Sequence, residues 1–129
     1  MIDQSTGQIR FRDESERVVD AGRWISPYTN DIITKASDID IDHVVPLAYA
    51  WDAGAYQMPF EQRVAFANDP INLLAVENSL NRSKGAKGVA EWLPPENECQ
   101  YVLRFIRILK KYDLEIEDVI YDVQNKECG

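Results

Sequence analysis

The chain has 129 residues, of which 45% are hydrophobic, and a formal net charge of -8 at pH 7. This length suits one domain with a modest core and is short for two ordinary domains. No apolar run approaches the roughly 20 residues of a membrane helix, and Met1 to Arg12 contain no apolar signal core. The composition therefore predicts a single globular domain over residues 1–129 and no membrane partner. We expect a cytoplasmic protein if Met1 is native and a secreted one if a leader was removed.

Basic residues are concentrated in one part of this acidic chain. Between Asn78 and Tyr112 there are seven Lys or Arg against three Glu, whereas the remainder has seven basic against 19 acidic residues. Such a zone is typical of phosphate contact, although each cation alone is equally well explained as part of a solvated helix face. The candidate phosphate contacts are Arg82, Lys84, Lys87, Arg104, Arg107 and Lys111.

The N-terminal region carries weak patterns. It predicts a short strand at Gln8 to Arg12 and a helical turn at Glu14 to Asp20. The segment from Arg23 to Asn30 predicts an aromatic loop that closes in a turn, because proline and asparagine suit turn geometry. We expect Trp24 and Tyr28 in this loop to cover an edge of the core.

Acidic and aliphatic residues alternate from Asp38 to Val45, which predicts a strand. One face would carry Ile39, Ile41 and His43, and the other Asp38, Asp40 and Asp42. Pro46 limits how far this strand can pair. His43 is the only histidine of the chain, so any histidine mechanism must use it.

Four elements are predicted after this strand. Alanine-rich segments at Leu47 to Tyr56 and Phe60 to Asn68 predict short helices, Asn72 to Val76 a strand, and Glu77 to Lys84 a helix that ends at Gly85. The resulting order is strand, helical insertion, strand, helix. It predicts an α+β domain built on a ββα unit.

The C-terminal third predicts packing helices. Apolar residues at helical spacing from Cys99 to Tyr112 indicate an amphipathic helix, and Ile116 to Val123 repeat the pattern in a last acidic helix within residues 113–129. The two cysteines, Cys99 and Cys128, have no zinc-site spacing. They are either free thiols or one disulfide that fastens the final helix, and a pair is favoured if the protein is exported.

The segments Asp42-His43, Asn72 and Asn81 resemble the core of the HNH endonucleases, also called His-Me finger or ββα-metal nucleases. Further similarity lies at Gly22-Arg23-Trp24, at Asp40 to Leu47, at Asn78 to Gly85 and at Glu91 to Pro95. Together these segments resemble small bacterial HNH proteins related to the C-terminal nuclease domain of GmrSD-type restriction enzymes. The resemblance covers about residues 22–112 and implies a ββα-metal core with a helical insertion and packing helices.

The resemblance implies a metal-dependent endonuclease that cuts phosphodiester bonds in DNA with one divalent ion. It implies that His43 is the general base, that Asp42 and Asn81 bind the metal, and that Asn72 orients His43 through its backbone or amide. Asn78 is an alternative ligand, a neighbour of the ligands or a helix cap. Asparagine at the third motif position, where many members have histidine, favours Mg²⁺ or Mn²⁺ over zinc.

The chemistry of the residues is consistent with these roles. Hydrolysis of a phosphodiester needs a base to activate water and a cation to hold the phosphate and the leaving oxygen. A neutral histidine is suited to be that base near physiological pH, and carboxylate and amide oxygens suit a hard cation. We expect weak sequence specificity, since no base-reading module accompanies the core. Double-stranded DNA, single-stranded DNA and RNA all remain possible substrates.

Other interpretations are open. Taken singly, His43 could be a core residue, Asp42 a solvent-facing acid and the asparagines turn or helix-end residues; their occurrence together and in order favours a nuclease. A catalytically inactive module that binds nucleic acid or protein is the main alternative. A serine hydrolase that uses Ser79 or Ser83 is poorly supported, because neither lies in a Gly-x-Ser-x-Gly motif.

Overall fold

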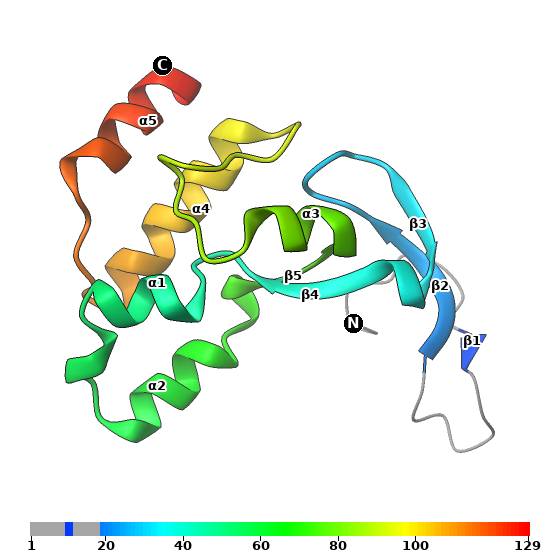
Figure 1. Cartoon of the computed structure of the whole chain (residues 1–129), viewed down its shortest axis with the longest axis horizontal. Helices are drawn as coiled ribbons and strands as arrows, with labels where there is room; N and C mark the ends of the chain where they lie inside the picture. Colours follow the sequence, from blue (N-terminus) through cyan, green and yellow to red (C-terminus); the bar gives the residue numbers. More distant parts are fainter. Residues whose placement is uncertain (1–9, 12–18) are drawn as a thin grey trace.

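The computed structural model describes residues 10–11 and 19–129, which form helices and two small antiparallel sheets (Figure 1). The three-stranded sheet has the order β1 (Arg10–Phe11), β2 (Val19–Ile25), β3 (Ile32–Lys35). The two-stranded sheet pairs β4 (Ile39–His43) with β5 (Leu73–Glu77). The α+β class predicted from the sequence is confirmed.

Five α-helices and three short 3₁₀ turns complete the described part of the chain. The helices are α1 (Leu47–Asp52), α2 (Phe60–Ala67), α3 (Asn78–Lys84), α4 (Glu98–Lys111) and α5 (Asp118–Cys128). The turns are η2 (Ala36–Asp38), η3 (Ala55–Gln57) and η4 (Pro70–Asn72). The predicted order of strand, helical insertion, strand and helix is observed as β4, α1–α2, β5 and α3.

The two-stranded β4–β5 sheet lies in the middle of the molecule, with α1 and α2 on one side and the three-stranded sheet on the other (Figure 1). Its register pairs Asp42 with Leu74 and His43 with Leu73. Burial along the strand departs from a simple alternation: Ile39 and Asp42, on opposite faces, are 6% and 5% exposed, whereas Ile41 is 37% exposed. A carboxylate is buried only with partners, so the face of Asp42 must supply them.

Two apolar clusters hold these elements together. The larger is centred on α4, whose Val102, Phe105 and Leu109 are fully buried, as the helical spacing predicted. The smaller joins the two sheets through Trp24 of β2, Ile39 of β4 and neighbouring residues. Because the sheets share no strand, this second cluster fixes the three-stranded sheet against β4–β5.

The N-terminal predictions need correction. The loop predicted from Arg23 begins later, because β2 continues to Ile25 and pairs with β3. Tyr28 and Trp24 are both 1% exposed, so they are core residues and not edge cover. Only Arg10–Phe11 of the first predicted strand is described, and residues 14–18 of the predicted helical turn lie outside the described residues, while its last two lie in β2.

The first predicted helix of the insertion is interrupted. It ends at Asp52, and η3 follows after Gly54, whose φ of 126° is a conformation that side-chain-bearing residues rarely adopt. Glycine therefore permits the turn that reverses the chain between α1 and α2.

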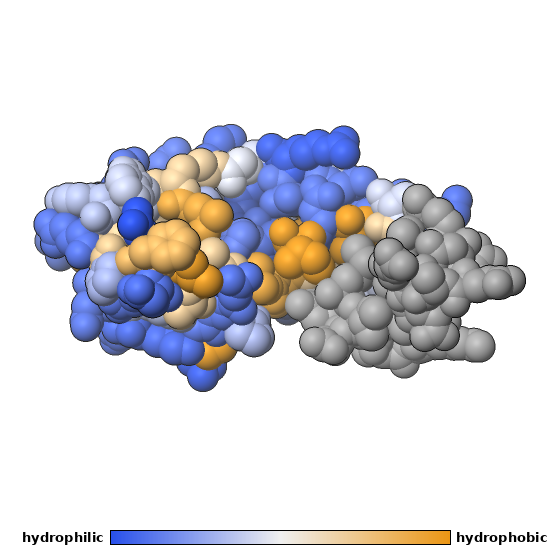
Figure 2. All heavy atoms as spheres, turned by 90° about the horizontal axis from the view of Figure 1, so that it is seen from below, coloured by the Kyte–Doolittle hydropathy of each residue, from blue (hydrophilic) through white to orange (hydrophobic). Residues whose placement is uncertain are grey.

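Apolar side chains are exposed along this insertion. Figure 2 shows apolar atoms gathered on the face below the view of Figure 1. Within the insertion, the exposed fraction is 48% for Leu47, 48% for Trp51, 69% for Phe60 and 41% for Val64. No described helix has the length and apolar character needed to cross a bilayer.

Asp69 fastens the segment between α2 and β5 to α4. Its carboxylate accepts hydrogen bonds from the Ile71 amide, from Lys111 Nζ at 2.6 Å and from the Tyr112 hydroxyl at 2.6 Å. Burial alone would raise the pKa of Asp69, but these hydrogen bonds outweigh it and lower the pKa to about 2. Lys111, predicted to contact phosphate, is thus engaged within the protein.

The two cysteines form one disulfide, which resolves the alternative left open by the sequence. Cys99 of α4 is bonded to Cys128 of α5, 29 residues further along the chain. The bond fastens the last helix, whose Ile120 is 2% exposed in the main core.

Replacing both cysteines by serine should lower the free energy of unfolding by about 3 kcal/mol, because the cross-link restricts a loop of this length in the unfolded chain. Urea denaturation of the variant and of reduced wild type would measure the loss. Equal stability with and without the cross-link would contradict this expectation.

Stability should fall as the pH drops from about 4 toward about 2, because the folded Asp69 resists protonation that the unfolded chain accepts. The Asp69→Asn variant should lose less stability than wild type between pH 6 and pH 3 in urea denaturation. Asp52→Asn, at an exposed position on α1, is the matched control. An acid dependence in Asp69→Asn equal to that of wild type would refute the assignment.

Candidate active site

Asn72 fixes the chain immediately after His43. Its Oδ1 accepts the Val45 amide at 2.8 Å and its Nδ2 donates to the Val45 carbonyl at 3.2 Å. Its own carbonyl accepts the Val44 amide at 2.9 Å, and the side chain is fully buried. Asn72 therefore acts on the backbone next to His43, and its described hydrogen bonds do not include the imidazole ring.

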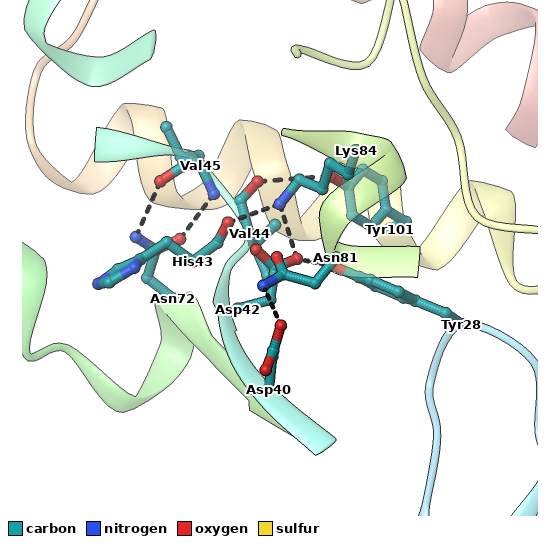
Figure 3. Close-up of polar contacts among 10 residues, drawn as sticks. All are labelled: Tyr28, Asp40, Asp42, His43, Val44, Val45, Asn72, Asn81, Lys84 and Tyr101. Atoms are coloured by element: carbon teal, nitrogen blue, oxygen red, sulfur yellow. Dashed lines mark hydrogen bonds and ion pairs between the residues drawn. The ribbon is translucent and has the colours of Figure 1, made fainter. Parts of the chain in front are cut away.

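His43 lies at the end of β4, on the face opposite Asp42 (Figure 3). Its Nε2 lies 2.8 Å from the carbonyl oxygen of Ala67, the last residue of α2. Since a carbonyl oxygen only accepts, Nε2 must carry the proton of the neutral ring. Nδ1 is then the nitrogen with a free lone pair, so this contact selects the atom that can act as base.

Asp42 lies in a buried polar cluster between β4, α3 and the loop after β2. Its Oδ2 accepts the Tyr28 hydroxyl at 2.6 Å and Lys84 Nζ at 2.8 Å. Burial raises the pKa of Tyr28 far above its ordinary value, and the nearby hydroxyl of Tyr101 and carboxylate of Asp42 raise it further. Tyr28 is therefore a permanent hydrogen-bond donor to Asp42.

Lys84 does not have the position predicted for a phosphate contact. Its side chain is fully buried, and Nζ contacts both Asp42 and the His43 carbonyl oxygen, the latter at 2.5 Å. Burial lowers the pKa of Lys84, while Asp42 opposes that shift. Lys84 lies in the last turn of α3, and its side chain extends beneath β4. Its ammonium therefore contacts groups inside the protein and is not available at the surface.

Asn81 and Asn78 lie on the same helix but have different partners. Asn81 Nδ2 donates to Asp40 Oδ2 at 3.0 Å, whereas Asn78 Nδ2 donates to the Ser37 carbonyl at 3.1 Å. Figure 3 shows Asn81 beside Asp40 and Asp42 on one side of β4. The structure therefore groups Asn81 with both acids and directs Asn78 toward η2.

Asp40 is a site residue that the sequence interpretation assigned no role. The signal was present, because residues two apart on a strand share a face and Asp40 precedes Asp42 by two positions. The contact with Asn81 distinguishes it from Asp38, which has no comparable described contact with the cluster.

The oxygen atoms of this cluster suit a hard divalent cation. Asp40 and Asp42 offer carboxylates and Asn81 an amide oxygen, which is the donor chemistry that Mg²⁺ prefers. Among the described residues there is no group of three or more His, Cys, Asp or Glu side chains that could hold a metal. Asp40, Asp42 and Asn81 would give a cation three protein oxygens, and Mg²⁺ commonly completes its coordination with water.

The remaining predicted phosphate contacts are of two kinds. Arg82, Lys87 and Arg107 are exposed. Arg104 is half-buried and its Nε donates to the Ile71 carbonyl at 2.6 Å, and Lys111 bonds Asp69 as described above. Exposed cations are therefore available on α3, on the turn after it and on α4.

The fold and the site define a small mixed α+β domain in which an acid-histidine pair at a strand end shares a polar cluster with a following helix. Residues 3–118 match the family model described as GmrSD restriction endonucleases, C-terminal domain, and the chain belongs to this family. The predicted resemblance is thus confirmed. The family is one of restriction endonuclease domains, which supports a nuclease type and a nucleic acid as substrate.

One curated relative gives a further comparison. An "Uncharacterized secreted protein" of Arthroderma benhamiae is 44% identical over 100 residues, which cover 74% of this chain and 49% of the relative. The match thus spans about half the length of that protein. No solved structure matches the chain.

Replacing Lys84 by methionine should cost about 3–5 kcal/mol of folding free energy, because Asp42 would remain buried without its counter-ion. Lys87→Met, at an exposed position after the same helix, should change stability by less than about 0.5 kcal/mol. Chemical denaturation measures both. The double variant Lys84→Met/Asp42→Asn should recover part of the loss, and equal stability of the two single variants would rule out a role for the ion pair.

Proposed function

We propose that this protein is a metal-dependent endonuclease of the HNH type that hydrolyses phosphodiester bonds in DNA. The observation that carries the proposal is the fixed tautomer of His43: Ala67 binds one ring nitrogen and leaves the other free at the strand end that also bears Asp42. Family membership supports the same class of reaction.

The residues divide the work as follows. Nδ1 of His43 accepts a proton from the attacking water, while Lys84 holds the His43 carbonyl and Asn72 holds the Val45 amide that follows it. Asp42 and Asn81, together with Asp40, would hold Mg²⁺ or Mn²⁺. When bound, such a cation neutralises charge on the phosphate and on the leaving oxygen.

Both described hydrogen bonds to the Asp42 carboxylate reach Oδ2. Oδ1 is therefore the oxygen that a cation would use. Lys84 and Tyr28 keep this carboxylate in one orientation, which is the arrangement expected for a ligand positioned by its neighbours. Asn78, bonded to Ser37, is better suited to positioning the start of α3 than to binding the ion.

Exposed Arg82, Lys87 and Arg107 would contact the phosphates that flank the cut, and such contacts carry no sequence information. We accordingly propose weak sequence specificity. One active site per chain would nick a duplex, and cutting both strands would need two copies or two encounters.

An inactive binding module is the second candidate, and one observation favours it. Lys84 already supplies a positive charge to Asp42, so this carboxylate has a counter-ion without a metal. In that case the domain would bind nucleic acid through its basic surface and leave it intact.

An oxidising location fits the chain. Disulfides such as Cys99–Cys128 persist mainly outside the cytosol, and the relative from Arthroderma benhamiae is described as secreted. We propose that the protein acts in an extracellular or similarly oxidising compartment.

Purified protein should nick supercoiled plasmid with Mg²⁺ or Mn²⁺ and fail to do so with EDTA. The rate should fall about 100- to 10,000-fold in His43→Ala, because proton transfer by a general base is worth that much. Asp42→Asn should also lose activity, and Asn125→Ala on α5 is the control. If folded wild type leaves plasmid, single-stranded DNA and RNA intact, the binding module replaces the nuclease.

A further inference from the structure

A small cavity of about 190 Å³ lies between α1, η3 and α2, separate from the polar cluster around Asp42. Its walls are mostly apolar and include Leu47, Trp51 and Phe66. Trp51 is 48% exposed, so one part of the indole is accessible from solvent. The cavity therefore offers an aromatic surface at an open edge.

Arg63 gives this apolar cavity one polar feature. Its guanidinium carbon lies 5.5 Å from the centre of a Trp51 ring, within the range of a cation-π contact. Its Nε is buried and has no hydrogen-bond partner among the described residues. Buried donors are rarely left unpaired, so Arg63 keeps hydrogen-bonding capacity that the described residues do not use.

The cavity adjoins the proposed general base. Ala67 forms part of its wall, and the carbonyl of this same residue accepts the hydrogen bond from His43. A group in the cavity would thus be separated from the imidazole by a single residue of α2. A ligand of the cavity would therefore lie near the histidine that is proposed to activate the attacking water.

The charge around the cavity argues against a phosphate as its occupant. The segment from Leu47 to Ala67 carries Asp52 and Glu61 against the single cation Arg63. Phosphates are better placed near the exposed cations of α3 and α4. The mostly apolar space, with Arg63 in its wall, suits an aromatic heterocycle that has ring nitrogen or carbonyl acceptors.

We propose that this cavity, formed by Trp51, Arg63 and their neighbours, binds the nucleobase of a nucleotide next to the phosphate that is cut. The base stacks on Trp51 and accepts a hydrogen bond from Arg63. A base within a duplex is paired and stacked, so it must be unpaired to enter. The preferred substrate is therefore single-stranded or locally unpaired nucleic acid, an inference that rests on the proposed nuclease function.

Binding to a labelled single-stranded DNA oligonucleotide tests the proposal by fluorescence anisotropy. The His43→Ala background prevents cleavage and keeps every side chain that lines the cavity. Trp51→Ala should weaken binding about 5- to 100-fold, because stacking of one base on an aromatic ring is worth that much. Arg63→Met, which keeps the length of the aliphatic stem, should also weaken binding.

Two controls isolate the base from the phosphates. Phe60→Ala removes a more exposed aromatic residue of α2 that does not line the cavity, and it should bind as the background does. An oligonucleotide of equal length with abasic sites keeps the charge and removes the bases. The cavity variants and the background should bind this abasic strand equally well.

Three results would overturn the nucleobase assignment. They are equal affinity of Trp51→Ala and Phe60→Ala for the normal strand, equal weakening on normal and abasic strands, and binding of duplex as tight as that of single strand. Thermal unfolding checks that each variant is folded. His43-dependent nicking in the otherwise wild-type protein, found together with any of these results, would reject the cavity and retain the nuclease.

Discussion

The buried ion pair between Lys84 and Asp42 is the interaction on which the site depends. Lys84 crosses from the end of α3 to β4 and also holds the His43 carbonyl, while Tyr28 donates to the same carboxylate oxygen. One ammonium thus fixes the acid, the backbone of the histidine and the angle of the helix. Burying two charges is costly, so the pair is explained better by the geometry it imposes than by any gain in stability.

Buried hydrogen bonds also fix the chain around His43 from the side of the helical insertion. Asn72 hydrogen-bonds both backbone polar groups of Val45 from a fully buried position, and the Ala67 carbonyl accepts a hydrogen bond from Nε2 of the histidine. Asp69, between these two residues, anchors their segment to α4. The end of the helical insertion therefore contacts β4 at His43. Because Ala67 also lines the cavity with Trp51 and Arg63, the cavity lies next to the histidine.

Much of the architecture followed from local patterns. The alternation in β4 and the helical spacing of α4 were visible in the sequence, because strand and helix periods determine which residues share a face. The continuation of β2 past Arg23 was missed, since it depends on pairing with β3. Lys84 and Arg82 carry the same charge two residues apart, and only their direction on α3 separates a buried counter-ion from a solvent-facing cation.

By itself the sequence determined the class of fold, the family and the histidine available for catalysis, because these depend on residue identity and order. The tertiary structure decided which groups meet. It placed Asn81 in a hydrogen bond with Asp40 and Lys84 in a salt bridge with Asp42. It also set the tautomer of His43 through the carbonyl of Ala67 and formed the disulfide between Cys99 and Cys128. Each of these contacts joins residues at least 24 positions apart, and such pairings follow from packing rather than from any local pattern.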